Sequence, residues 1–165
     1  MDLITLLQKE MEAEAAITRK MLARVPAEKF DWQPHQKSMS LKALATHIAE
    51  LPGWVQSAVH ANGIDFAVIP YKPQEIASTG ELLDFFEEKL GVAREALKTA
   101  DVSTFNEEWV LRDGDKVFLT STKYEMLRTT FCQIVHHRAQ LGVYFRLLDI
   151  PVPASYGPSA DEPNF

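Results

Sequence analysis

The sequence lacks the features that mark secreted or membrane-spanning proteins. It contains a single cysteine, Cys132, so no internal disulfide can form and a zinc site built from several cysteines is excluded. No apolar run approaches the ~20 residues that span a bilayer. The first residues also lack the basic stretch and apolar run of a signal peptide. We therefore expect a cytoplasmic protein that does not enter a membrane.

Basic residues are in the minority. The chain has 17 Lys and Arg against 23 Asp and Glu, which gives a formal net charge of −6. Binding to nucleic acid needs clustered cations that contact phosphates, so the sequence predicts no nucleic-acid partner. The hydrophobic residues, by contrast, make up 46% of 165 positions, which is enough to bury the core of one domain. We expect a single domain over residues 1–165, with Cys132 as a small buried apolar residue within it.

Four segments carry apolar residues at three- and four-residue spacing, which is the pattern of an amphipathic helix. They span about residues 2–25, 40–59, 79–101 and 122–149. Ser40, Ser78 and Thr122 stand at the expected helix starts as N-cap residues, and the last two are followed three residues later by glutamate, as in a capping box. Pro52-Gly53 falls inside the second segment, so that helix is either kinked there or stops and restarts.

A different pattern occupies residues 106–119. Trp109-Val110-Leu111 and Lys116-Val117-Phe118-Leu119 are β-prone runs on either side of Asp113-Gly114, which predicts a short hairpin. Residues 26–39 predict an ordered loop whose aromatic residues plug one end of the molecule, and residues 62–78 predict an irregular connector. The sequence therefore predicts an all-α four-helix bundle, with a short β-hairpin between the third and fourth helices.

Polar side chains lie beside the apolar stripes in two of these helices. His47 comes three residues after Leu44 and four before Leu51, which places it at the edge of a buried stripe. In the last helix, one face carries Gln133, His137, Gln140 and Tyr144. Residues four apart on a helix can hold one ion between them, but the same pattern also fits a hydrogen-bonded network or a solvated face. His136 is rotated from His137 by about 100°, and we expect it on the other side of the helix, at an interface or in solvent.

Several blocks of the sequence resemble the DinB-like superfamily. They are Phe30-Asp31-Trp32-Gln33-Pro34-His35, the run from Leu44 to Pro52, His136-His137-Arg138-Ala139-Gln140-Leu141, and the ending from Val152 to Ser159. The blocks follow the family's order over essentially the whole chain. The resemblance implies a four-helix bundle of DinB-like type, commonly a homodimer, with a divalent metal (nickel or zinc) held by three histidines. His47 matches the first of these histidines and His137 the last, whereas Gln133 occupies the position of the remaining one.

Gln133 is the departure with the largest consequence. Its amide oxygen is neutral and binds zinc or nickel more weakly than imidazole does, so the metal is either weakly held or absent. Glu10 and Glu14 on the first helix are lesser candidates for a carboxylate ligand, because residues that flank an apolar stripe are typically solvated. Glu50, three residues after His47, either orients the second ring nitrogen of that histidine, as outer carboxylates do, or is a surface charge.

Two functions stay open at this point. Relatives in the superfamily include metal-dependent thiol transferases and isomerases, and others are described as hydrolases. The resemblance thus implies an enzyme that acts on a small-molecule substrate or thiol at a metal bound by His47, Gln133 and His137, with Tyr144 or Gln140 orienting the substrate. Alternatively, the chain is a metal-free, non-enzymatic module for small-ligand binding or stress response, in which those three residues form a hydrogen-bonded network.

Overall fold

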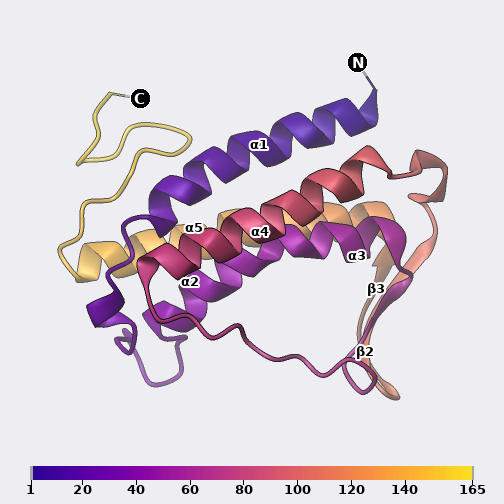
Figure 1. Cartoon of the computed structure of the whole chain (residues 1–165), viewed down its shortest axis with the longest axis horizontal. Helices are drawn as coiled ribbons and strands as arrows, with labels where there is room; N and C mark the ends of the chain where they lie inside the picture. Colours follow the sequence, from indigo (N-terminus) through magenta and orange to yellow (C-terminus); the bar gives the residue numbers. More distant parts are fainter. Residues whose placement is uncertain (1, 165) are drawn as a thin grey trace.

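The computed structural model describes residues 2–164, which are mostly helical with a small sheet. The α-helices are α1 (Leu3–Leu22), α2 (Leu41–Glu50), α3 (Trp54–His60), α4 (Thr79–Lys98) and α5 (Lys123–Leu147). They run along the long axis of the molecule, and the strands β1 (Gly63–Asp65), β2 (Glu108–Asp113) and β3 (Lys116–Thr122) lie at one end (Figure 1). The expectation of an all-α protein was therefore too narrow. None of the helices in this range is both long enough and apolar enough to cross a membrane.

Side chains at the helix starts explain where the long helices begin. The side chain of the residue before the helix accepts a hydrogen bond from a backbone N–H of the first turn. The four capping residues are Asp2, Ser40, Ser78 and Thr122. Such a cap contributes about 0.5–2 kcal/mol. At Thr122 the capping box is complete, because the Glu125 carboxylate accepts the Thr122 N–H at 2.8 Å. At Ser78 the glutamate Glu81 instead accepts the N–H of Ala77 at 2.8 Å, so the expected box is displaced by one residue.

Pro52 tightens the second helical segment without opening it into a loop. The helix α2 stops at Glu50, a single 3₁₀ turn (η2, Leu51–Gly53) follows, and α3 begins at Trp54. The backbone stays right-handed helical through this turn, with φ −79° and ψ −27° at Glu50 and φ −62° and ψ −23° at Gly53. Since proline has no N–H to donate, a tight turn replaces the α-helical hydrogen bond. Of the two alternatives, the helix stops and restarts at once.

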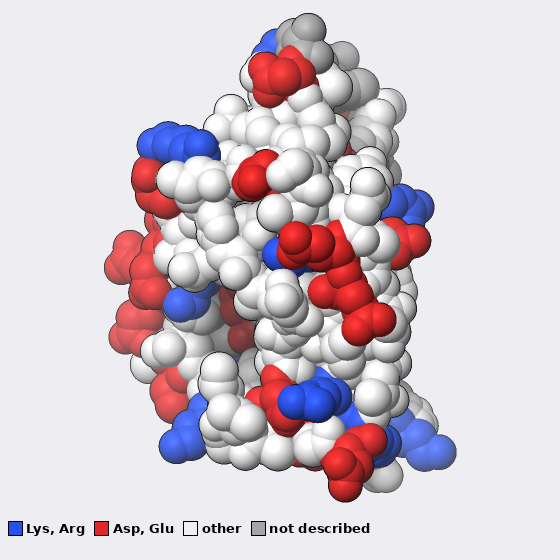
Figure 2. Space-filling model, turned by 90° about the vertical axis from the view of Figure 1, so that its right-hand side faces the viewer, with Lys and Arg blue, Asp and Glu red and all other residues white. Residues whose placement is uncertain are grey.

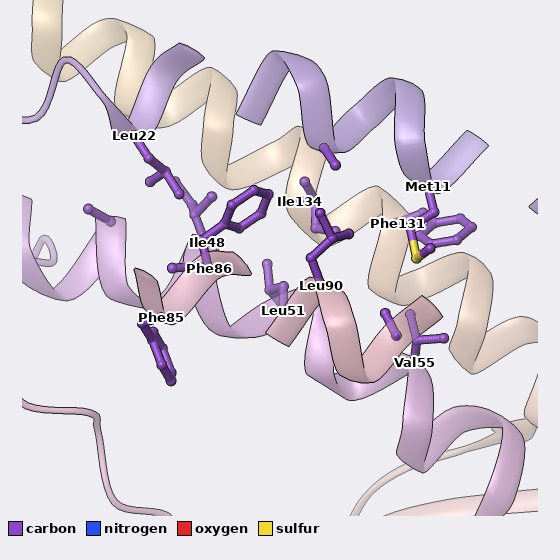
Figure 3. Packing of buried hydrophobic residues seen from close by; sticks show 14 of the residues in the cluster. Met11, Leu22, Ile48, Leu51, Val55, Phe85, Phe86, Leu90, Phe131 and Ile134 are labelled. Atoms are coloured by element: carbon purple, nitrogen blue, oxygen red, sulfur yellow. The ribbon is translucent and has the colours of Figure 1, made fainter. Parts of the chain in front are cut away.

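Side chains from all the long helical segments meet in one core. Figure 3 shows Met11 and Leu22 of α1, Ile48, Leu51 and Val55 of the α2–η2–α3 segment, Phe86 and Leu90 of α4, and Phe131 and Ile134 of α5. Phe85 of α4 belongs to the same cluster and lies at its edge in this view. Burying one large apolar side chain stabilises the fold by about 1.5–3 kcal/mol. Because Ile48 and Ile134 lie in this shared core, the polar residues beside them on α2 and α5 are brought near each other.

The sheet combines a hairpin that the sequence predicted with a strand that it did not. The strands β2 and β3 are antiparallel, Asp113 pairs with Lys116, and Gly114 takes the turn with φ 56°, a conformation that favours glycine. The unexpected strand β1 runs parallel to β2. Trp109 of β2 is fully buried, and its indole N–H donates to the Ser57 carbonyl of α3 at 3.1 Å. This contact fixes the sheet against the helices.

The loop of residues 26–39 covers one end of the core, as expected. Phe30 is buried and Trp32 packs against the core. The ring of Trp32 also meets that of Tyr144 edge to face, with 5.4 Å between their centroids. These contacts tie the loop to α5.

Acidic and basic side chains are interspersed over the end of the molecule shown in Figure 2. Two ion pairs join α1 to α4: Arg19 with Glu87 at 2.5 Å and Arg94 with Glu12 at 2.6 Å. All four side chains are substantially exposed, and exposed ion pairs contribute about 0–1 kcal/mol each. Packing of the core, more than surface charge, therefore holds the helices together.

Candidate functional site

His47 lies on α2 at the edge of the buried stripe and is held by a carboxylate. Its Nδ1 is 2.6 Å from Oε1 of Glu50, three residues further along the helix. Glu50 is buried, and the hydroxyl of Tyr71 donates to both of its oxygens, at 2.9 and 3.1 Å. A carboxylate accepts hydrogen bonds, so Nδ1 of His47 carries the proton, and in the neutral ring Nε2 keeps its lone pair. Glu50 therefore orients His47 and is not a surface charge.

His137 on α5 is held in the same way by an amide. Its Nδ1 is 3.0 Å from Oε1 of Gln140, and Nε2 of Gln140 is 3.1 Å from Nε2 of His136. The amide oxygen can only accept, which again places the proton on Nδ1 and leaves the lone pair on Nε2. Burial lowers the pKa of His137, and the nearby His47 and His136 lower it further, while the bond to Gln140 acts in the opposite direction. The neutral form, which can bind a metal, is thus favoured.

The two histidines meet across the boundary between α2 and α5. Their ring centroids are 4.7 Å apart and their planes cross at 77°. Gln133 lines the same open cleft, which has a volume of about 490 Å³, together with Arg128 and Cys132. The structure thus brings together the three residues that the sequence singled out.

Two residues of this cleft lie where the sequence did not place them. Cys132 is exposed, so the expectation of a buried cysteine was wrong. His136 is exposed, as expected, but it also lines the cleft, with its ring centroid 5.0 Å from that of His137. Adjacent residues on a helix can both reach an open cleft when its mouth is wide.

Tyr144 and Gln140 differ in their surroundings. Tyr144 is buried and its hydroxyl donates to the Met39 carbonyl at 3.1 Å, so it secures the loop of residues 26–39. Gln140 is exposed and bridges the two neighbouring histidines. It orients His137, and Tyr144 has a structural role.

Arg138, the neighbour of His137, is buried between α1 and α5. Its Nη2 lies 2.6 Å from Oε2 of Glu14, a charge contact outside hydrogen-bond geometry, and 2.8 Å from the Tyr156 hydroxyl. Its Nη1 lies 3.1 Å from Oγ1 of Thr18. Glu14 is therefore not a solvated carboxylate, contrary to expectation, because it forms an ion pair with Arg138. This pair joins α5 to α1 at the residue next to His137.

The donor set offers a metal two strong ligands and one weak one. Within residues 2–164, His, Cys, Asp and Glu nowhere form a cluster of three that could hold a metal ion. Two imidazoles and an amide side chain that lines the same cleft fit a divalent metal only loosely, since an amide oxygen is a poor ligand for zinc or nickel. The residues present suit a labile site that keeps several positions open.

Sequence reasoning missed Tyr71. It lies in the connector of residues 62–78, where no periodicity or motif marked it. Only its contact with Glu50, 21 residues away along the chain, reveals its place beside the site.

Comparisons with known proteins agree on the fold. The model of the DinB family matches residues 2–164. A DinB-like protein from Bacillus subtilis has a similar structure, with a TM-score of 0.69 and 15% identity, over 91% of this chain and 96% of the other. A DinB-like protein from Bacillus cereus gives a TM-score of 0.67 and 18% identity, over 91% and 95% of the two chains.

A more distant neighbour is a mycothiol-dependent maleylpyruvate isomerase. The TM-score is 0.58 at 13% identity, and the similarity covers 86% of this chain and 61% of the isomerase. None of the curated proteins matches the chain significantly. These likenesses show the fold, and the family model covers nearly every residue. The chain belongs to the DinB family.

Proposed function

We propose that the cleft between α2 and α5 is a weak divalent-metal site of a small-molecule enzyme, of the thiol transferase or hydrolase type, built on a bundle of DinB type. His47 and His137 would bind nickel or zinc through Nε2, and Gln133 would offer its amide oxygen as a third ligand. One observation carries the proposal. In both histidines Nδ1 meets an oxygen acceptor, at 2.6 Å in His47 and 3.0 Å in His137, which is how metal-binding histidines are held.

The cleft also suits a small anionic thiol as substrate. When bound, a divalent metal would lower the pKa of a thiol or water that it coordinates, so that this ligand would lose its proton at neutral pH. Arg128 lines the cleft, and its guanidinium can bind a carboxylate of the substrate. Gln140 and Glu50 hold the two imidazoles in place. The structural neighbour that depends on mycothiol supports the choice of thiol as substrate class.

Metal titration of untagged protein tests the proposal. Nickel and zinc binding is measured by calorimetry for the wild type and for Gln133→His, which restores a third imidazole. We expect the substitution to tighten binding by more than about tenfold, or about 1.4 kcal/mol. Gln56→His adds an imidazole at an exposed position of α3 and should leave affinity unchanged. Absence of binding in both the wild type and Gln133→His, with no thiol conjugation after metal is added, would rule out the enzyme.

A metal-free ligand-binding module is the second candidate, because the amide at position 133 is a poor ligand for zinc or nickel. The hydrogen-bonded network expected among His47, Gln133 and His137 does not form within residues 2–164. His47 is bonded to Glu50 and His137 to Gln140, and Gln133 makes no side-chain hydrogen bond there. Gln133→Ala should therefore leave the free energy of unfolding unchanged in either case, and in the metal-dependent enzyme it should also weaken metal binding modestly. Metal titration of the wild type and of Gln133→Ala, beside urea denaturation of both, separates the two candidates.

We also propose that the protein forms a homodimer. Val143 and Leu147 on the outer side of α5 are each 58% exposed, and large apolar side chains left in water favour association. Sedimentation equilibrium of the wild type gives the oligomeric state directly. A monomer at all concentrations would contradict the proposal.

A further inference from the structure

Tyr71 and Glu50 form a chain of hydrogen bonds that ends at His47. The Tyr71 hydroxyl donates to both carboxylate oxygens of Glu50, at 2.9 and 3.1 Å, and Oε1 of Glu50 accepts the Nδ1–H of His47 at 2.6 Å. Tyr71 comes from the connector between β1 and α4, whereas Glu50 and His47 lie on α2. A residue distant along the chain therefore contacts the residue that orients His47.

The carboxylate of Glu50 depends on these two donors. Its side chain is only 10% exposed, and a buried carboxylate is strongly disfavoured unless hydrogen bonds satisfy it. In the described part of the chain, the hydrogen bonds to its oxygens come from His47 and Tyr71. Loss of the tyrosine hydroxyl would leave His47 as the single donor.

Glu50 also lines a second pocket, of about 320 Å³, which Lys72 and Lys89 share and whose lining includes neither His47 nor His137. The Lys89 ammonium is 2.8 Å from Glu88 and lies over the Phe85 ring. Lys72 is therefore the cation that would attract a carboxylate no longer held by a hydroxyl. A turn of Glu50 toward Lys72 would remove the acceptor from Nδ1 of His47. The ring could then move its proton to Nε2, which would eliminate the lone pair on the cleft side.

The sheet fixes the start of the connector that carries Tyr71. Oδ1 of Asp65 accepts the N–H groups of Ala67 and Gly114, both at 3.0 Å, and Oδ2 of Asp65 lies 2.9 Å from Arg112. The Phe66 N–H donates to the Arg112 carbonyl at 2.9 Å. The Phe66 ring then packs edge to face on Tyr71, with 6.5 Å between centroids. The hairpin thus holds the segment that brings Tyr71 to Glu50.

We propose that Tyr71 is a positioning residue for His47. Its hydroxyl keeps Glu50 on the histidine side, and Glu50 keeps the His47 proton on Nδ1, so that Nε2 presents its lone pair to the cleft. This inference deepens the proposed function and rests on it only for the consequence that metal binding weakens without Tyr71. The tautomer of His47 is a property of the metal-free chain.

Nitrogen-15 NMR of the histidine rings in the metal-free protein tests the inference, with His47→Gln used to assign the signal. Wild type should show a protonated Nδ1 and an unprotonated Nε2 for His47. Tyr71→Phe removes only the hydroxyl and should shift both nitrogens toward a mixture of the two tautomers. Tyr124→Phe, which removes a hydroxyl at an exposed position of α5, should give the wild-type spectrum. A His47 spectrum that does not change in Tyr71→Phe would overturn the inference.

Cobalt(II) titration supplies the second readout. Loss of a residue that orients a metal-bound histidine weakens affinity by about 10–100-fold, so we expect about tenfold for Tyr71→Phe and more for Glu50→Ala. Glu50→Gln keeps an oxygen acceptor for Nδ1 and should restore most of the affinity lost in Glu50→Ala. If wild type binds no cobalt, the proposed function fails while the tautomer measurement still decides the role of Tyr71. If Tyr71→Phe does not fold, the His47 signal of Glu50→Ala decides instead, and an unchanged tautomer there overturns the inference.

Discussion

Removing one partner of the buried ion pair between Glu14 and Arg138 should lower the free energy of unfolding far more than removing one partner of a surface pair. The Arg138 side chain is 4% exposed and that of Glu14 is 12% exposed. Truncating one member of such a pair leaves an uncompensated buried charge, at a cost of about 3–5 kcal/mol. The total stability of a domain is about 5–15 kcal/mol. We therefore expect Glu14→Ala to remove a large share of the stability, because Arg138 keeps only its neutral contacts to Thr18, Tyr156 and the Glu14 carbonyl.

Urea denaturation of a double-mutant cycle measures this effect. The cycle compares Glu14→Ala, Arg138→Met and the double variant, and the exposed pair of Arg94 with Glu12 is the matched control, with an expected coupling of about 0.2–1 kcal/mol. The double variant should be more stable than Glu14→Ala, since no charge is then left buried without a partner. A loss below about 1 kcal/mol in Glu14→Ala, the level of surface pairs, would refute the reasoning.

Two further predictions concern the sheet and the histidine pair. Gly63 has φ 152°, and a Cβ there would lie 2.1 Å from the Val110 carbonyl oxygen. Gly63→Ala should therefore destabilise the fold by about 1–3 kcal/mol in urea denaturation. Gly91→Ala in α4 is the control, because the added Cβ meets no atom within 4 Å beyond the neighbouring backbone of its own helix, and it should gain about 0.5–1 kcal/mol. Equal effects of the two substitutions would contradict the strain at Gly63. The lowered pKa of His137 means that the folded chain binds fewer protons than the unfolded one just below pH 6.5, so the free energy of unfolding should fall as the pH drops from 6.5 toward the lowered pKa. His137→Gln should show a smaller fall between pH 7 and pH 5, and an unchanged slope would exclude His137 as the source.

Local sequence patterns predicted most of the secondary structure. The periodic apolar residues and the caps at Ser40 and Thr122 marked the helices, because both signals act within one or two turns. The Asp113-Gly114 turn marked the hairpin for the same reason. The strand β1 was missed because three residues carry no readable period. Its pairing partner, β2, lies more than 40 residues away along the chain.

The residues of the candidate site were likewise predicted only in part from the sequence. The family pattern singled out His47, Gln133 and His137, and helical spacing placed His47 and His137 beside buried stripes. The same spacing misjudged Glu14, since a residue that flanks a stripe is exposed or buried according to the neighbour that packs beside it. Cys132 was misjudged because free cysteine is usually buried. Here Arg138 of α5 and Tyr156 of the C-terminal segment cover Glu14, and Cys132 faces the open cleft.

The sequence by itself determined which face of each helix is apolar, where the helices begin, and which polar residues lie beside those faces. Periodicity carries this information because side-chain direction repeats along a helix axis. Only the tertiary structure decided that the His47 ring meets that of His137, that Arg138 is neutralised by Glu14, and that Tyr71 reaches Glu50. Each of these contacts joins segments far apart in the chain, and they form because burying the shared core brings those segments together.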